Sequence, residues 1–452
     1  MTITALEQMP DAELRGVAEA AGLRVGADLA RRDLIYGILE AQATAGSDRT
    51  DRTADRRRAP RVRRAIAATW PDYMQAFDPA AVSLEGLIRK VGVLELLPDG
   101  YGFLRSAEYS YLSSADDIYV SPSQIKRFSL RLGDTVDGQI RPPKEGERFF
   151  ALLRVNTING CTPDTFTERT GYDFLTPAYP DEQIRLGAAP GAVAARLVDL
   201  VAPIGKGQRG LVVSPPRAGR TTLIEHLAQA LTASNPDATL IVLLVDERPE
   251  DVKAVERAVP GAEVVATTFD EAPERQVHVA DLVLEKAKRL VEAGQDVVIL
   301  LDSITRLARA HNSLPRPAEA RAGLDAAALR GPKRLFGAAR AVEEGGSLTV
   351  VATLLTETGS ALDDAIAEEF AGTGNMELHL RQDLAAAGLF PAVDVFRSGT
   401  RREEMLVPPE RLAAVRALRA GLAGQTPADA LAGLLARIAA TDSNDDLLGT
   451  AP

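Results

Sequence analysis

The sequence predicts an α/β domain with a parallel sheet in its C-terminal part, preceded by a small helical unit and a small β-barrel. Apolar runs rich in Val, Ile and Leu alternate with helical segments in the C-terminal part. Each run is apolar on both faces, as in parallel sheets covered by helices on both sides. We therefore expect a RecA-like or otherwise doubly wound domain over 191–452. Its expected strands are 211–213, 239–245, 264–267, 297–301 and 348–354.

The N-terminal residues 1–45 show the spacing of apolar residues that is typical of amphipathic helices. The pair Pro10-Asp11 is a plausible helix start. Residues 46–83 contain an arginine-rich stretch mixed with Asp, Thr and Pro, which cannot build a core. We interpret this stretch as a solvated linker between the helical unit and the barrel.

Residues 84–160 contain a series of short strand patterns separated by turn sequences such as Pro98-Asp99-Gly100. Five short strands within about seventy residues predict a small barrel, and the cold-shock-like OB-fold is the commonest such barrel. Residues 161–190 are expected to connect the barrel to the α/β domain, and the stretch 176–191 is rich in Pro and Gly. The expected barrel strands are 92–97, 101–105, 118–120, 135–140 and 149–155.

The composition is that of a globular protein, because 46% of the 452 residues are hydrophobic and 25% are charged. A net charge of −11 argues against coating nucleic acid through bulk charge, although a local binding groove stays open. The single cysteine, Cys161, excludes an internal disulfide and fits a reducing compartment. No apolar run reaches the roughly 20 residues that span a bilayer, and no signal peptide is evident. We therefore expect a cytoplasmic protein without a membrane segment.

Residues 210–228 are typical of a strand, a tight glycine turn and a helix that begins with hydroxyl residues. A helix N-terminus offers unpaired N–H groups and a positive dipole end, so a triphosphate over Gly219, Arg220 and Thr221 would be held mainly by backbone. The strict Walker A pattern is broken by Ser214 at its first position and Arg220 at its lysine position. On this segment alone, an ordinary strand-to-helix turn remains an alternative.

Two acidic residues stand at predicted strand ends, where a nucleotide hydrolase needs them. Asp302 ends an apolar strand in the manner of a Walker B carboxylate that holds Mg²⁺, with Thr221 as the hydroxyl partner. Glu247 ends a second strand, where it could orient and deprotonate the attacking water. Acids are common at solvated strand ends. The glycine turn and the two acids nevertheless follow one another in the order expected within one α/β domain, and together they predict a nucleotide site.

The second predicted barrel strand places Tyr101, Phe103 and Arg105 on one face, because strand side chains alternate. Exposed aromatic rings beside an arginine can stack unpaired bases and contact phosphate, as OB-folds do with single strands. The alternative is that Tyr101 and Phe103 fill the barrel core.

Other polar residues are interpreted structurally. The four histidines lack metal-ligand spacing and are expected to be solvated or packed: His226, His278, His311 and His379. Four acids are expected on an exposed helix face: Asp363, Asp364, Glu368 and Glu369.

Several long motifs closely resemble the family of bacterial transcription termination factor Rho, over nearly the whole chain. Three lie in the predicted barrel: Asp99-Gly-Tyr-Gly-Phe-Leu-Arg-Ser106, the segment 116–125 and the segment 140–148. Five lie in the predicted α/β domain: Asp246-Glu-Arg-Pro-Glu250, Leu301-Asp-Ser-Ile-Thr-Arg-Leu-Ala-Arg309, 342–349, 372–378 and Arg397-Ser-Gly-Thr-Arg401.

The resemblance implies a ring-shaped homohexamer that binds nascent RNA on its barrels, threads it by ATP hydrolysis with Mg²⁺ and releases RNA polymerase. It also implies a NusG-type elongation factor as a partner. By matching position, Arg401 would be an arginine finger, Glu247 the catalytic base and Phe390 the ring that stacks on adenine. The implied nucleotide contacts are Arg217, Ala218, Gly219, Arg220, Thr221, Thr222 and Arg248, with Arg220 also in a catalytic role and Thr221 and Asp302 serving Mg²⁺. The implied RNA contacts are Tyr101, Phe103, Arg105, Asp117, Tyr119, Glu147, Phe149 and Arg321.

The chain departs from the family pattern mainly in the motor. Both lysines of the usual Pro-Pro-Lys-Ala-Gly-Lys-Thr loop are arginines, Arg217 and Arg220. A guanidinium keeps the charge but replaces a compact ammonium by a longer planar fork. The pore-loop stretch 320–323 departs from the usual Leu-Thr-Gly-Gly, and Ala361 and Gly388 stand where the family carries a lysine and an arginine.

Three functions therefore compete. The first is an ATP-driven RNA translocase that terminates transcription, which the strand-end acids and Arg401 favour. The second is a ring that captures RNA but has a slow or silent motor, which the departures favour. The third, a subunit of a rotary ATPase, is disfavoured because that role needs no base-stacking aromatics on a barrel.

Overall fold

The structure is a computed structural model that describes residues 6, 9–21, 34–35, 38, 88–143, 147–166, 169–187, 192–314 and 323–449. It divides into two compact units, which are described separately. The first contains Met1–Ser106 and Ser113–Glu168, and the second contains Ala107–Leu112 and Arg169–Pro452. The predicted linker 46–83 lies outside the described residues.

The described helix of the predicted helical unit is α2 (Asp11–Ala20). It begins directly after Pro10, where the sequence predicted a helix start, and it buries Leu14 and Val17. Most of the remaining residues of 1–45 lie outside the described part.

The first unit contains the predicted closed barrel of five strands, in the order β1-β2-β3-β5-β4. The neighbouring strands are antiparallel except β3 and β5, which are parallel. Buried Leu94, Leu104 and Val136 contribute to its core. Its strands are β1 (Ile88–Leu96), β2 (Gly102–Arg105), β3 (Ile118–Val120), β4 (Thr135–Arg141) and β5 (Phe150–Ile158), and its helices are α6 (Pro122–Arg127) and α7 (Pro163–Phe166).

The second unit is built on a sheet whose central strands are parallel, in the order β14-β13-β7-β12-β10-β8-β9. The predicted strands correspond to β7 (Arg209–Ser214), β8 (Thr239–Glu247), β9 (Glu263–Thr268), β10 (Asp296–Asp302) and β12 (Ser347–Leu355). The four strands that were not predicted are β6 (Pro177–Ala178), β11 (Arg340–Val342), β13 (Met376–His379) and β14 (Gly399–Thr400).

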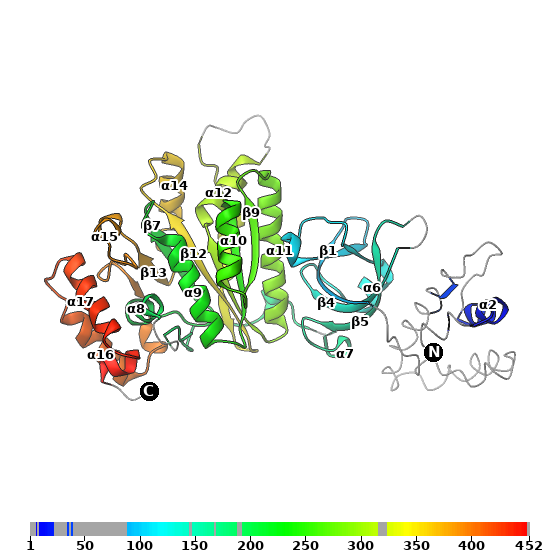
Figure 1. The fold of residues 1–452 in the computed structure, drawn as a ribbon, viewed down its shortest axis with the longest axis horizontal. Coiled ribbons are helices and arrows are strands. Elements are labelled where there is room, and N and C mark those ends of the chain that lie inside the picture. Colours follow the sequence, from blue (N-terminus) through cyan, green and yellow to red (C-terminus); the bar gives the residue numbers. More distant parts are fainter. Residues whose placement is uncertain are drawn as a thin grey trace. The chain divides into compact units, whose positions relative to one another are not determined.

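Helices cover both faces of this sheet, as the apolar runs predicted (Figure 1). Helices α9 (Arg220–Ser234) and α10 (Pro249–Ala258) follow β7 and β8 and pack on one face. The chain reverses its direction across the sheet after β9, so right-handed crossovers bring α11 (Pro273–Glu292) and α12 (Ile304–Ser313) to the other face. The predicted RecA-like α/β class is thus confirmed.

A group of C-terminal helices packs against α8 (Val193–Val201), which in turn packs against α9. The group comprises α16 (Pro409–Ala420), α17 (Pro427–Ala439) and α18 (Asn444–Leu448). The remaining elements of the second unit are η3 (Ala107–Tyr109), η4 (Tyr172–Phe174), α13 (Arg330–Gly337), α14 (Ala361–Phe370), α15 (Gln382–Ala386) and η5 (Glu403–Met405). In the part of the chain that the structure describes, no helix has the length and apolar character to cross a bilayer.

Candidate functional site

The glycine turn between β7 and α9 has the backbone of a phosphate-binding loop. Gly219 caps α9 with φ 81° and ψ 26°, a left-handed conformation that favours glycine. A Cβ atom at Gly219 would lie 3.2 Å from ring atoms of Phe390, so a side chain would also crowd that ring. No side chain caps α9, which leaves the N–H groups of its first turn available to an anion.

The side chains of the loop differ in exposure. Ala218 is buried, whereas Arg217 and Thr222 are exposed and Thr221 is half-buried. Arg217 has φ 62°, so the turn contains two left-handed residues, Arg217 and Gly219. Successive turn N–H groups of this kind form a concave surface suited to phosphate oxygens.

The two predicted acids end neighbouring strands and face the loop. Glu247 is the last residue of β8 and is 5% exposed, and Asp302 is the last residue of β10 and is fully buried. These strands pair in register, with Asp302 opposite Leu244. From β12, the hydroxyl of Thr353 donates a 2.8 Å hydrogen bond to Asp302 Oδ1.

Arg220 joins the phosphate loop to both acids. Its Nε lies 2.9 Å from Asp302 Oδ1 and 3.2 Å from Asp302 Oδ2, and its Nη2 lies 4.0 Å from Glu247 Oε2. The side chain of Arg220 is only 14% exposed, so solvent screens these contacts weakly. Arg220, at the lysine position of the predicted motif, therefore forms an ion pair with Asp302, the predicted Walker B carboxylate.

Arg306, near the start of α12, forms a second ion pair with Glu247. Its Nη1 donates to the Glu247 carboxylate and, over 2.7 Å, to the carbonyl oxygen of Asp246. Burial raises the pKa of Glu247, and Arg306 opposes this shift. Nearby Asp302 raises the pKa of Glu247 further, and Arg220 lowers it. Arg306 lies within one of the sequence motifs, but its role could not be predicted, because tertiary folding brings it to Glu247.

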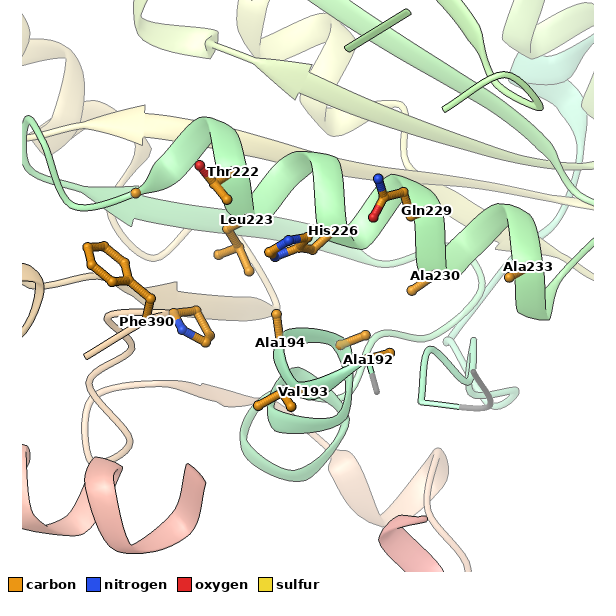
Figure 2. Close-up of a pocket in the computed structure, with 13 residues that line it drawn as sticks. Ala192, Val193, Ala194, Thr222, Leu223, His226, Gln229, Ala230, Ala233 and Phe390 are labelled. Carbon is orange, nitrogen blue, oxygen red and sulfur yellow. The ribbon is translucent and has the colours of Figure 1, made fainter. Parts of the chain in front are cut away.

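A cleft of about 720 Å³ lies beside the phosphate loop (Figure 2). One wall is the face of α9 that runs from Thr222 to Ala233, and the opposite wall is the start of α8. Phe390, which is 56% exposed, stands with Pro391 at the end near Gly219. The predicted stacking residue and the predicted phosphate loop therefore line one cleft.

The loop and the end of β10 carry oxygen groups of the kind that a magnesium ion prefers. Mg²⁺ prefers oxygen ligands and keeps several waters, so it is usually held by one or two protein groups. The Asp302 carboxylate and the Thr221 hydroxyl are such groups, although Arg220 already contacts both carboxylate oxygens. Among the described residues, no cluster of three or more His, Cys, Asp or Glu side chains is arranged to hold a metal.

Two further predicted nucleotide residues lie on the surface. Arg248 is the exposed residue that precedes α10, and Arg401 is exposed directly after β14. The backbone N–H of Arg401 donates a 2.8 Å hydrogen bond to Asn375. Within the described residues, no hydrogen bond or ion pair joins Arg401 to Glu247, Asp302 or Arg220.

The barrel brings four predicted RNA-binding aromatic residues into one cluster. The ring of Phe103 lies 5.9 Å from that of Tyr101, 6.1 Å from that of Tyr119 and 4.9 Å from that of Phe149. The pairing of Phe103 with Tyr119 across β2 and β3 explains the contact. Tyr101 and Phe103 are half-buried. Leu104, the residue after Phe103 in β2, is buried in the barrel core.

The charged residues of this cluster are already paired. Arg105 is 8% exposed; it donates to Asp117 and, over 2.5 Å, to Glu95, and its guanidinium lies 5.3 Å from the centre of the Phe103 ring. Glu147 accepts a 2.6 Å hydrogen bond from Arg141. The partners Glu95, on the neighbouring strand β1, and Arg141, at the end of β4, were missed in the sequence.

Two predicted residues, Arg321 and Asp363, belong to neither of these clusters. Arg321 lies outside the described residues. The expectation that Asp363 lies on an exposed helix face is wrong, because Asp363 is fully buried. It accepts hydrogen bonds from Arg309 of α12, one of them 2.6 Å long, and from Thr358. A buried carboxylate needs such partners, which the local sequence does not reveal.

Both units match models of known families. The Rho termination factor RNA-binding domain matches residues 90–164, and the nucleotide-binding domain of the ATP synthase alpha/beta family matches residues 194–400. A solved structure of an ATPase from the type III secretion system of pathogenic bacteria has a TM-score of 0.50 and 22% identity. That likeness covers 61% of this chain and 86% of the other, and it concerns the fold.

Relatives similar over the whole length define the family. Transcription termination factor Rho of Escherichia coli strain K12 is 47% identical, over 99% of this chain and 98% of the relative. The protein of the same name from Buchnera aphidicola subsp. Acyrthosiphon pisum is 48% identical over the same shares. With a Rho-type barrel and an ATPase-family domain in one chain, the protein belongs to the transcription termination factor Rho family.

Proposed function

We propose that this protein terminates transcription as an ATP-driven RNA translocase, and that it acts as a homohexameric ring in the cytoplasm. The observation that carries the proposal is the pair of carboxylates, Glu247 and Asp302, at the ends of adjacent strands facing the phosphate loop. An aromatic cluster on the barrel of the same chain supplies an RNA-binding surface. Residues 84–160 would capture RNA and residues 191–452 would use the nucleotide.

ATP would be held chiefly by the backbone of the loop that precedes α9. The N–H groups of residues 218–222 would bind phosphate oxygens, with Arg217, Arg220 and Arg248 adding positive charge. Phe390 would stack on the adenine. Mg²⁺ held by Thr221 and Asp302 would neutralise charge on the phosphates.

Glu247 would act as the base that orients and deprotonates the attacking water. Its raised pKa suits this role, because a buried carboxylate binds a proton more readily than an exposed one. Arg306 is a positioning residue that fixes the carboxylate. Arg401, which is exposed, would reach the nucleotide of a neighbouring subunit and stabilise the charge of the transition state.

On the barrel, the rings of Tyr101, Phe103, Tyr119 and Phe149 would stack on unpaired bases. The ion pairs of Arg105 with Asp117 and of Arg141 with Glu147 would present hydrogen-bonding edges to those bases. Nascent RNA, an RNA polymerase elongation complex and a NusG-type factor would be the partners, and Arg321 a further RNA contact.

The experiment is release of a transcript from a paused RNA polymerase by the full-length protein. We expect release with ATP and none with a non-hydrolysable analogue. Glu247→Gln should reduce release about 10²-fold or more, the usual effect of losing a general base. Glu250→Gln, at an exposed position of α10, is the matched control and should leave release intact. Release that does not need ATP hydrolysis would refute the proposal.

A second candidate is a Rho-type ring that captures RNA while its motor is slow or silent. The ion pair of Arg220 with Asp302 favours it, because the guanidinium occupies the carboxylate that the metal would use. Single-turnover hydrolysis distinguishes the candidates, and Arg220→Lys supplies the comparison. Turnover that is near zero in the natural protein and is restored by Arg220→Lys would establish the second candidate; rapid turnover in the natural protein would exclude it.

A further inference from the structure

The carboxylate of Asp302 has no contact with solvent, and both of its oxygens already meet a donor. Oδ1 accepts the 2.8 Å hydrogen bond from Thr353 and lies 2.9 Å from Arg220 Nε. Oδ2 accepts a 3.2 Å hydrogen bond from the same nitrogen. A buried carboxylate needs donors and a counter-charge of this kind. A hydrated ion can therefore reach these oxygens only after a neighbouring group has moved.

Arg220 is the neighbour of Asp302 that has the freedom to move. Thr353 lies within β12 and is fully buried, so the sheet fixes its hydroxyl. Arg220 is the first residue of α9, and its long side chain is 14% exposed. Its Nη2 lies 4.0 Å from Glu247 Oε2, which is too far for a hydrogen bond. The contact with Asp302 is therefore the one that holds the guanidinium between the two acids.

A guanidinium and a divalent cation compete for such a carboxylate. Mg²⁺ binds oxygen at about 2.0–2.1 Å in a near-octahedral shell, which leaves little room for an N–H group aimed at the same oxygen. Two positive charges this close in a buried site also repel each other. The phosphates of a nucleotide would change the balance, because a guanidinium binds phosphate through two parallel hydrogen bonds. The N–H groups that would hold those phosphates begin α9, as Arg220 does.

We propose that Arg220 determines the order in which ligands bind: it blocks the metal position on Asp302 until the phosphates of a nucleotide draw its guanidinium away. The nucleotide binds first and the divalent cation second. A lysine would block the position less firmly, because its ammonium is a point charge on a flexible stem and lacks the Nε–H group that contacts Asp302. This inference rests on the proposed nucleotide site and adds the regulation of its metal position.

The test measures binding of Mn²⁺, a paramagnetic ion that takes the same oxygen ligands as Mg²⁺, to the full-length protein by electron paramagnetic resonance. Without nucleotide, Arg220→Gln should bind Mn²⁺ about tenfold more tightly than the natural protein, the scale on which neighbouring groups tune metal affinity. Adding Asp302→Asn to Arg220→Gln should remove this gain. Arg257→Gln deletes the same charge at an exposed position of α10 and is the control, which should bind Mn²⁺ as the natural protein does.

Asp302→Asn alone gives a second comparison, which does not need Arg220→Gln to fold. Without nucleotide it should leave the Mn²⁺ affinity unchanged, because Arg220 already blocks the carboxylate. With a non-hydrolysable ATP analogue bound, it should weaken Mn²⁺ binding about tenfold, because the guanidinium has left.

Three results would overturn the inference: equal Mn²⁺ affinities of the natural protein and a folded Arg220→Gln, weaker Mn²⁺ binding by Asp302→Asn without nucleotide, or no effect of Asp302→Asn when the analogue is bound. Each of these leaves nucleotide binding itself in place. If the analogue fails to displace a fluorescent nucleotide from the natural protein, the proposed function fails instead. The nucleotide-free comparison would then still decide whether Arg220 blocks Asp302.

Discussion

At the scale of single residues, the carboxylate of Glu247 is the group whose environment most affects the proposed chemistry. It is 5% exposed, contacts Arg306 and lies within reach of Arg220 and Asp302. Burial raises its pKa, and the arginines limit that rise. A base must be ionised to accept a proton, so its activity is lost as the pH falls through this pKa.

Arg306→Ala should move the acid limb of hydrolysis to higher pH. Removing the guanidinium takes away an interaction that favours the ionised carboxylate, so the pKa of Glu247 rises further and the active form is lost sooner on acidification. The measurement is the single-turnover rate as a function of pH. Arg306→Lys keeps a positive charge and should shift the limb less. An acid limb that does not move in Arg306→Ala would show that Glu247 is not the titrating base.

Among the elements, the β2–β3 pair of the barrel carries the aromatic cluster on its outer side. Leu104 is buried in the core, whereas Phe103 is half-buried between Tyr119 and Phe149. Side chains alternate between the two faces of β2, so Leu104 points into the core and Phe103 lies on the face where a base could stack. This placement argues against the alternative in which Phe103 only fills the barrel.

Phe103→Ala should weaken binding of a short cytidine-rich RNA by about tenfold, because one stacked base contributes roughly 1–3 kcal/mol. Fluorescence anisotropy in the absence of nucleotide measures the affinity. Tyr109→Ser removes an exposed aromatic residue outside the barrel and serves as the control. Loss of RNA binding in the control, or full binding by Phe103→Ala with an unchanged melting temperature, would contradict the assignment of the cluster.

Helix α8 connects the nucleotide cleft to the C-terminal helices through Arg196. This residue is 2% exposed, and its guanidinium donates to the carbonyl oxygens of Ile438, Thr441 and Ser443 and to Asn444. Its side chain thus contacts carbonyl groups at the end of α17 and in the segment that follows it. The start of α8 forms a wall of the cleft.

Arg196→Met should destabilise the C-terminal helices by about 3 kcal/mol, because the carbonyl groups of Ile438, Thr441 and Ser443 each lose a hydrogen bond from a charged donor. Hydrogen exchange of the amides of α17 measures the local effect. Arg416→Ala, whose side chain is 59% exposed, should change exchange little. Equal protection of α17 in Arg196→Met and the natural protein would show that this arginine does not anchor the helix.

The extent to which sequence predicts structure differs between elements. Long apolar runs such as 239–245 and 348–354 predicted β8 and β12 closely, because burial on both faces leaves a continuous signal. The four-residue β13 was missed because so short a strand carries no period. The loop and its two acids were predictable from their order along the chain. Their partners Arg306 and Thr353, and the partner Glu95 of Arg105, could not be predicted, because tertiary folding brings these side chains into contact.

For the whole molecule, the proposed ring assembly predicts that one active site uses residues of two subunits. Glu247 lies at the buried end of β8, whereas Arg401 is exposed and is not joined to it by any contact within the described residues. An arginine finger supplied by a neighbour accounts for both placements.

Mixing Glu247→Gln and Arg401→Ala subunits should therefore restore hydrolysis that each variant alone lacks. Some junctions in a mixed ring combine an intact Glu247 from one subunit with an intact Arg401 from its neighbour. Single-turnover hydrolysis by remixed rings measures the recovery. Rings that contain one variant only are the controls, and no recovery in mixed rings would place both residues in the same subunit's site.

The central proposal is that RNA captured by the barrel drives ATP hydrolysis at the loop that carries Arg217 and Arg220. The most direct test is steady-state ATP hydrolysis by the full-length protein, measured with and without a cytidine-rich RNA. We expect slow hydrolysis without RNA and a rate increase of about tenfold or more with RNA, a change of about 1.4 kcal/mol or more in the barrier. A rate that is the same with and without RNA would contradict it.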